Sequence, residues 1–193
     1  MKLVMGVGFN DMRGSTSHTE NGKTVRLKSY DNWKTMLFRA YDHKPFRPTY
    51  EGCSVAEVWH TFSKFNTWHD ENYREGWVLD KDILIPGNRV YSPKGCVYVP
   101  SELNAFVACR MISRGDQPLG VRYRDGKYTA QISDGKNGKQ KHLGSFLSPQ
   151  QAHLAWYEEK MRRAIGYKRL CNTIHPDLFD GLLQNIKNLK EEG

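Results

Sequence analysis

The stretch Gly120-Val-Arg-Tyr-Arg-Asp-Gly-Lys-Tyr-Thr-Ala-Gln-Ile-Ser133 decides the fold of the C-terminal part of this chain. Its centre, Asp125-Gly126, is the strongest short signal for a β-hairpin. Over residues 127–133 apolar and polar side chains alternate, which is typical of a strand with one buried face. A second polar turn over residues 134–138 leads into Lys139-Gln-Lys-His-Leu-Gly-Ser-Phe146. The sequence therefore predicts three antiparallel strands.

A helix is expected directly after the third strand. Ser148 is a suitable N-cap, and Pro149 suits the first helical position. The helical pattern continues to about Ile165, and Gly166 is placed to end it as a C-cap. The apolar positions that would pack on the sheet are Ala152, Ala155 and Trp156. The polar positions expected on the uncovered face of the sheet are Arg122, Arg124, Gln131 and Lys141.

Residues 118–166 resemble the DNA-binding domain of the Apetala-two/ethylene-response-factor type. The resemblance implies that the three-stranded sheet lies in the DNA major groove, with arginines and aromatics contacting bases and phosphates. Carried over by position, the implied DNA-binding residues are Arg122, Arg124, Tyr128, Gln131, Ser133 and Lys141. Tyr128 stands where the family has tryptophan, and Gln131 and Ser133 replace an acidic and a basic residue. This departure implies a sequence specificity that is weaker or different.

Upstream, residues 77–104 predict two short strands, a loop between them and a helix. Trp77–Asp80 and Cys96–Val99 have the pattern of strands, and Pro86-Gly87-Asn88 interrupts the loop. Ser101 is placed to cap a helix that continues to about Met111.

This order of elements is similar to the ββα-metal unit of HNH endonucleases, in particular the phage-borne proteins related to homing endonucleases. In that family, an Asp on the first strand and an Asn or His on the helix bind a divalent metal. The resemblance thus implies Asp80 and Asn104 as metal ligands, Asn88 as the loop residue that orients the base, and Mg²⁺ (or Mn²⁺) as cofactor. Carboxylate and amide oxygens are the ligands that Mg²⁺ prefers. The implied reaction is hydrolysis of DNA phosphodiester bonds.

Lys81 stands where the family has its catalytic histidine. A lysine would need strong desolvation or cationic neighbours to act as a general base. Three interpretations follow. Another group activates the water, with Asp82, His69 and His60 as the candidates. Alternatively, a metal-bound hydroxide suffices, or the unit has been kept for DNA binding without cleavage.

The remainder of the N-terminal part is expected to be helical after a partly ordered arm of residues 1–30. One helix begins near Asp31 and carries an apolar stripe. A second, capped by Ser54, extends from Val55 through about Trp68. The aromatic side chains on these helices are expected to form the core.

The fold class expected is therefore α+β, with three regions. Residues 1–112 form the HNH-like unit with its arm, residues 118–168 form the sheet module, and residues 171–193 form a C-terminal amphipathic helix. Of the net charge of +8, most lies in residues 111–170, which carry 12 basic and 5 acidic side chains. An excess of positive charge favours a nucleic-acid partner.

Composition excludes several classes of protein. No apolar run approaches the ~18 residues needed to cross a bilayer. The four cysteines contain no C-x-x-C pair, so we expect free thiols in a cytoplasmic protein without a structural zinc site. The expected partner is double-stranded DNA and no membrane. Two functions compete with an endonuclease: an inactive, regulatory DNA-binding protein, and a phage protein that binds a host factor.

Overall fold

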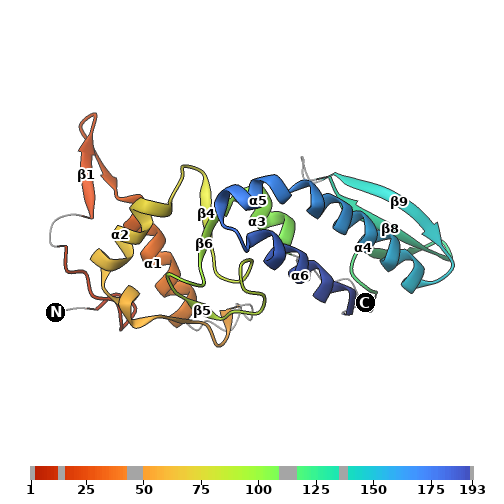
Figure 1. Ribbon diagram of the computed structural model, residues 1–193, viewed down its shortest axis with the longest axis horizontal. Coiled ribbons are helices and arrows are strands. Elements are labelled where there is room, and N and C mark those ends of the chain that lie inside the picture. Colours follow the sequence, from red (N-terminus) through yellow and green to blue (C-terminus); the bar gives the residue numbers. More distant parts are fainter. Residues whose placement is uncertain (1–2, 13–15, 43–49, 109–116, 135–138, 192–193) are drawn as a thin grey trace. The chain divides into compact units, whose positions relative to one another are not determined.

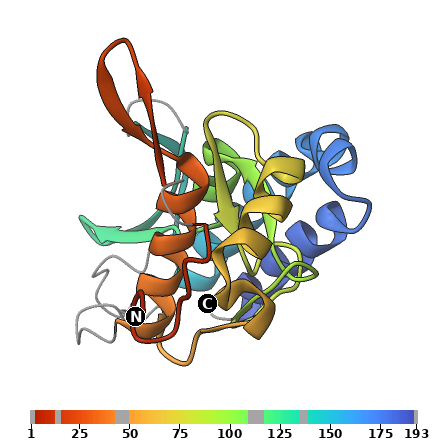
Figure 2. The same cartoon turned by 90° about the vertical axis from the view of Figure 1, so that its left-hand side faces the viewer.

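The computed structural model describes residues 3–12, 16–42, 50–108, 117–134 and 139–191. They form a mixed α+β fold with small sheets, which confirms the expected class. The chain divides into two compact units, Met1–Tyr98 and Val99–Gly193 (Figures 1 and 2). Among the described residues, no helix combines the length and apolar character that a bilayer crossing requires.

The first unit is built from short strands around two helices. Its elements in chain order are β1 (Ser17–Glu20), β2 (Lys23–Arg26), α1 (Lys28–Tyr41), β3 (Ser54–Val55), the 3₁₀ helix η2 (Glu57–His60), α2 (Phe62–Asn72), β4 (Trp77–Asp80), β5 (Val90–Tyr91) and β6 (Val97–Pro100). β4 pairs with β6, and the division between the units falls within β6.

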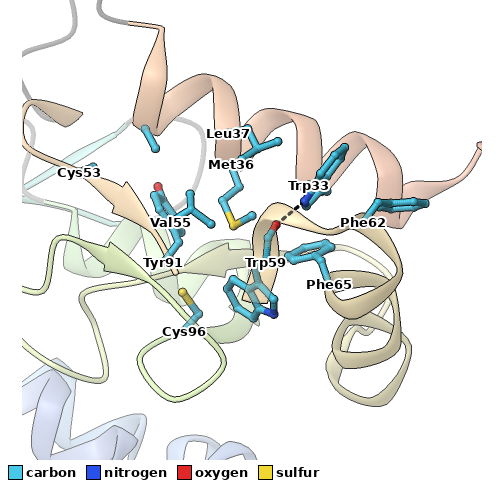
Figure 3. Packing of buried hydrophobic residues seen from close by; sticks show 11 residues of the cluster. Trp33, Met36, Leu37, Cys53, Val55, Trp59, Phe62, Phe65, Tyr91 and Cys96 are labelled. Carbon is cyan, nitrogen blue, oxygen red and sulfur yellow. Dashed lines mark hydrogen bonds between the residues drawn. The ribbon is translucent and has the colours of Figure 1, made fainter. Parts of the chain in front are cut away.

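Aromatic and aliphatic side chains of α1, η2 and α2 form the core of the first unit (Figure 3). Trp33, on the stripe expected from the sequence, is fully buried, and its Nε1–H donates to the Trp59 carbonyl oxygen at 2.7 Å. The bond satisfies the indole where water is excluded, as a buried tryptophan requires. The aromatic residues of this region are thus core residues, as expected.

The predicted helix over residues 55–68 is wrong in its first half. Ser54 does not cap a helix but lies in β3, which pairs with β5 in parallel register, Ser54 opposite Val90. The Ser54 N–H donates to the Arg89 carbonyl oxygen at 2.9 Å, so the backbone here is hydrogen-bonded to a segment distant in sequence. α2 then starts at Phe62, after η2. Tertiary pairing here overrides a local helical pattern.

The N-terminal arm contains a β-hairpin that the sequence analysis missed. β1 and β2 pair antiparallel through a turn at Asn21-Gly22, both residues having positive φ. Asn-Gly is the preferred pair for such a turn, so the signal was present. α1 begins at Lys28, three residues before the expected Asp31.

The second unit contains a three-stranded sheet with helices on one face. Its elements, after the end of β6, are α3 (Ser101–Val107), β7 (Val121–Arg124), β8 (Lys127–Ser133), β9 (Gln140–Phe146), α4 (Pro149–Gly166), α5 (Lys168–Ile174) and α6 (Leu178–Glu191). The strand order β7-β8-β9 and the antiparallel pairing confirm the prediction. The expected turn at 135–138 lies outside the described residues.

α4 covers one face of this sheet (Figure 1). Ser148 caps it as predicted, its Oγ accepting the Gln151 N–H at 3.2 Å, with Pro149 at the first position. The core between sheet and helix consists of Leu119, Val121, Ala130, Ile132, Ala152 and Trp156. Gly166 does not act as a terminal cap, because α5 follows after only Tyr167.

The last helix packs within the second unit. α6 contacts α4 and α5, and Leu178, Leu182 and Ile186 are fully buried. α3 also belongs here: the buried ammonium of Lys160 on α4 donates to the Phe106 carbonyl oxygen and lies 4.1 Å from the centroid of that ring. α3 ends at Val107, earlier than expected, and its N-cap position is occupied by Pro100, with Ser101 as the first helical residue.

Candidate functional site

The face of the β7–β8–β9 sheet that α4 leaves uncovered is polar and basic. Cross-strand partners share a face, and Arg122 lies opposite Thr129, which lies opposite Ser145. By the same register the open face consists of Arg122, Arg124, Lys127, Thr129, Gln131, Ser133, Gln140, His142 and Ser145. None of these strand residues is acidic, and three are cationic. Asp125, in the turn, pairs with Arg124 at 3.2 Å, with both side chains highly exposed.

Lys141 lies on the opposite face, so its expected position on the open face is wrong. It pairs with Ile132, a core residue, and its Nζ lies 3.3 Å from Glu159 Oε1 of α4. The physical reason is the register of β9, which alternation within a single strand does not give. Tyr128, also implied as a DNA contact, is half-buried on this helix-covered side, opposite Phe146.

Glu159 forms ion pairs with Lys141 and with two arginines of α4. Its carboxylate accepts from Arg162 Nε at 2.7 Å and from Arg163 Nε at 3.0 Å. These donors, with Arg162 the largest influence, hold the pKa of Glu159 well below its usual range. Lys141 therefore serves as part of an ion-pair network under the sheet.

Lys127 and His142 are open-face residues that the sequence analysis did not select. Lys127 has the same parity in β8 as Gln131, so strand alternation could have found it. His142 lies opposite Gln131, but this required the register of β9. That register is irregular between Ala130 and Gln131, where a bulge interrupts the pairing.

A second cluster of predicted residues surrounds the loop that follows β4. Asp80 Oδ1 accepts the backbone N–H groups of Asp82 at 2.9 Å and Ile83 at 2.7 Å. An aspartate that accepts backbone N–H groups two and three residues on stabilises a tight turn. Desolvation, followed by the charge of Asp82, raises the pKa of Asp80 from 3.8 to about 6.

Lys81 is buried beneath this turn, with only 7% of its surface exposed. Its Nζ donates to Asp82 Oδ2 at 2.6 Å and to the Asn88 carbonyl oxygen at 3.1 Å. It also lies 5.9 Å from the centroid of the Tyr91 ring. The side chain therefore acts as a paired cation and donor, whereas a general base must accept a proton.

Asn88 closes the loop across from Lys81. Its Nδ2 donates to the Lys81 carbonyl oxygen at 2.6 Å and to the Val90 carbonyl oxygen at 2.9 Å, and its Oδ1 accepts the Val90 N–H at 3.0 Å. The structure thus brings Asp80, Lys81, Asp82 and Asn88 together in one hydrogen-bonded loop.

The two candidate histidines have partners in the core of the first unit. His69 is 4% exposed, stacks on Tyr73 with ring centroids 4.6 Å apart, and its Nε2 lies 3.3 Å from Asn32 Nδ2. Burial lowers the pKa of His69, against an opposing effect of Asp70. His60 Nε2 lies 2.9 Å from the Tyr41 hydroxyl. These contacts join secondary-structure elements and indicate structural roles.

Asn104, the implied second metal ligand, lies in α3 of the second unit, whereas Asp80 belongs to the first. Within the described parts of the chain, no group of three or more His, Cys, Asp or Glu side chains is arranged to hold a metal ion. Cys53, Cys96 and Cys171 are buried free thiols, in line with the sequence analysis. No family model, curated protein or solved structure matches the chain.

Proposed function

We propose that this protein binds double-stranded DNA through the open face of the β7–β8–β9 sheet. The observation that carries the proposal is the register, which puts Arg122, Arg124 and Lys127 on one face without an acidic strand residue among them. A solvent-facing sheet surface of this kind complements the phosphate charge of DNA. α4 packs on the other face, so contact with DNA would not disturb the core.

The residue types on this face support both positioning and reading of a duplex. Arginine is the commonest partner of guanine, and glutamine can pair with adenine, both in the major groove. Arg122 and Gln131 are suited to such contacts. Lys127, Ser133 and Ser145 are suited to phosphate oxygens, which orient a protein on DNA without reading its sequence.

Arg122→Ala and Arg124→Ala are each expected to weaken DNA binding by about 1–3 kcal/mol, roughly 5- to 150-fold in Kd. The physical reason is the loss of a guanidinium that bonds a base edge or phosphate. Fluorescence anisotropy with a labelled duplex, at several salt concentrations, measures the effect. Because both side chains are exposed, the unfolding temperature should not change.

Lys141→Ala is the matched control, since this lysine lies in the same sheet but pairs with Glu159 on the covered side. Its affinity for DNA should stay close to that of the unaltered protein. Equal losses from Arg122→Ala and Lys141→Ala would mean that only total charge matters, which contradicts the proposed face. Absence of any salt-dependent DNA binding would reject the function.

A DNA endonuclease of HNH type is the second candidate function. The observation that favours it is the position of Asp80 and Asp82 at the start of a loop closed by Asn88, where Asp80 Oδ1 accepts the Asp82 N–H at 2.9 Å. These carboxylates are oxygen donors of the kind that suits Mg²⁺ or Mn²⁺, and such an ion, when bound, would stabilise charge on a phosphodiester. Lys81 would neutralise Asp82, and Asn88 would keep the loop closed.

Asp80→Asn is expected to stabilise the protein by about 1–3 kcal/mol at pH 8. A folded pKa of about 6, above the ordinary 3.8, means that the folded state holds the proton more tightly. Asp80 therefore stabilises the fold at acidic pH, and this contribution is lost as pH rises through 6. Asparagine keeps Oδ1 as acceptor for the two N–H groups but has no charge. Urea unfolding from pH 4 to pH 8 should show the pH dependence flattened in the variant.

The same variant tests the metal. If Mg²⁺ binds at Asp80, millimolar Mg²⁺ raises the unfolding temperature of the unaltered protein but not that of Asp80→Asn. Plasmid incubated with protein and Mg²⁺ or Mn²⁺ should then be nicked, and Asp80→Asn should abolish nicking without abolishing DNA binding. Folded protein that nicks no DNA with either ion would reject the endonuclease. A gain of cleavage on Lys81→His would instead identify the unit as an inactivated nuclease.

A further inference from the structure

The β1–β2 hairpin projects from the start of α1 in the first unit (Figures 1 and 2). All four residues of β2, Lys23 to Arg26, are exposed, as are Asn21 and Gly22 in the turn. The ribbon has two strands and pairs with no other strand among the described residues. A lone two-stranded ribbon is only marginally stable in water.

The side chains of β2 and of the neighbouring part of α1 are suited to a polyanion. Lys23 and Arg26 lie on β2, with the exposed Glu20 of β1 opposite Lys23, and Lys28 and Lys34 are exposed on α1. Arg26 Nη1 lies 3.1 Å from Asp31 Oδ1, which fixes its guanidinium at the base of the ribbon. Asn21, Thr19 and Thr24 add neutral hydrogen-bonding groups along the strands.

A hollow beside the ribbon continues this surface. Its lining is Met5, Arg26, Asp31, Lys34, Thr35 and Phe38. Arg26 and Lys34 provide two cations for one carboxylate, and the hollow lies where β2 leads into α1. A phosphate group in it would meet both cations.

We propose that the β1–β2 hairpin is a second DNA-binding element, which enters a groove of the duplex while the hollow at its base holds a backbone phosphate. The inference rests on the proposed function and extends it to the first unit. The geometry fits because the major groove admits a two-stranded β-ribbon. Lysines on an edge strand oppose the addition of a further strand, so Lys23 disfavours a protein partner that pairs with β2.

Full-length Lys23→Ala/Lys34→Ala protein tests the proposal with a labelled duplex of mixed sequence. Each lost phosphate contact should reduce the slope of log K against log salt by about 0.9, so the double variant should lose about 1.8. Lys64→Ala/Lys94→Ala is the matched control, because these lysines are also exposed in the first unit but lie outside the hairpin and the hollow. The control should keep nearly the original slope. Both variants should keep the original unfolding temperature.

Hydrogen exchange provides the second measurement. DNA should protect the hairpin amides of Lys23 and Val25, which belong to hydrogen-bonded pairs of the ribbon, since binding orders a marginal ribbon. If the unaltered protein binds DNA while the slope and this exchange do not change, the hairpin proposal is wrong and the sheet proposal stands. The ribbon would then be left for a protein partner. If the unaltered protein binds no DNA, the proposed function itself fails.

Discussion

Gly120→Ala is expected to destabilise the second unit by about 3–5 kcal/mol, through backbone strain and overpacking together. Gly120 has a φ of +78°, and a Cβ added there would lie 2.1 Å from Cγ of Trp156. Trp156 is 5% exposed in the core between sheet and α4, so its ring cannot move aside cheaply. Gly120 also accepts the Gln131 N–H at 2.8 Å, which ties the start of β7 to β8.

Gly126→Ala separates the two causes. Gly126 has nearly the same φ, +76°, but a Cβ there meets nothing within 4 Å. We expect a cost of about 1 kcal/mol from strain alone. Urea unfolding followed by circular dichroism, with hydrogen exchange at β8 amides, reports the second unit. If Gly120→Ala and Gly126→Ala lost similar amounts of stability, the contact with Trp156 would not be what excludes a side chain at position 120.

The sheet module could be predicted from the sequence because its signals are local and agree with one another. The turn at Asp125-Gly126, the alternation in β8 and the cap at Ser148 each depend on neighbours a few residues away. All three are present in the structure. Consistency of this kind between levels favours one fold.

The parts that could not be predicted depend on distant partners. Ser54 joins a strand because Val90 pairs with it. The sequence around Ser54 contains no signal for a pairing with a residue so far along the chain. Lys141 lies on the helix-covered side of the sheet because of the register in which β9 pairs, and its Nζ donates a hydrogen bond to Glu159 of α4. A shift of one residue in register exchanges the two faces of a strand.

The loop after β4 was predicted as a set of residues but not as a network. The resemblance to HNH endonucleases selected Asp80, Lys81 and Asn88 by their positions along the chain. It did not show that Lys81 is buried and bonded to the Asn88 carbonyl oxygen. The burial of a charged side chain depends on the groups that surround it in three dimensions. Lys81, which stands where the family has its general base, is in the structure the cation that pairs with the Asp82 carboxylate.

Lys81→Met is accordingly expected to cost about 2–4 kcal/mol of stability, near the low end of the cost of breaking a buried ion pair. Methionine keeps most of the volume of the stem but removes the Lys81 ammonium as a donor to both Asp82 and the Asn88 carbonyl oxygen. Asp82 is 46% exposed in its side chain, so water compensates for part of the loss. Lys94→Met, at an exposed position in the turn between β5 and β6, should change stability by less than about 0.5 kcal/mol.

Lys81→Met/Asp82→Asn distinguishes the ion pair from packing. If the unpaired carboxylate causes the loss, removing its charge should restore part of the stability, since neutral replacement of both partners is often tolerated. Equilibrium urea unfolding of the four proteins in this cycle gives the coupling free energy. A coupling near zero would mean that Lys81 stabilises the loop only through its stem and its bond to Asn88. A substantial coupling would show that the residue at the base position is fixed as a cation, which favours a DNA-binding protein over a nuclease that uses Lys81 as its base.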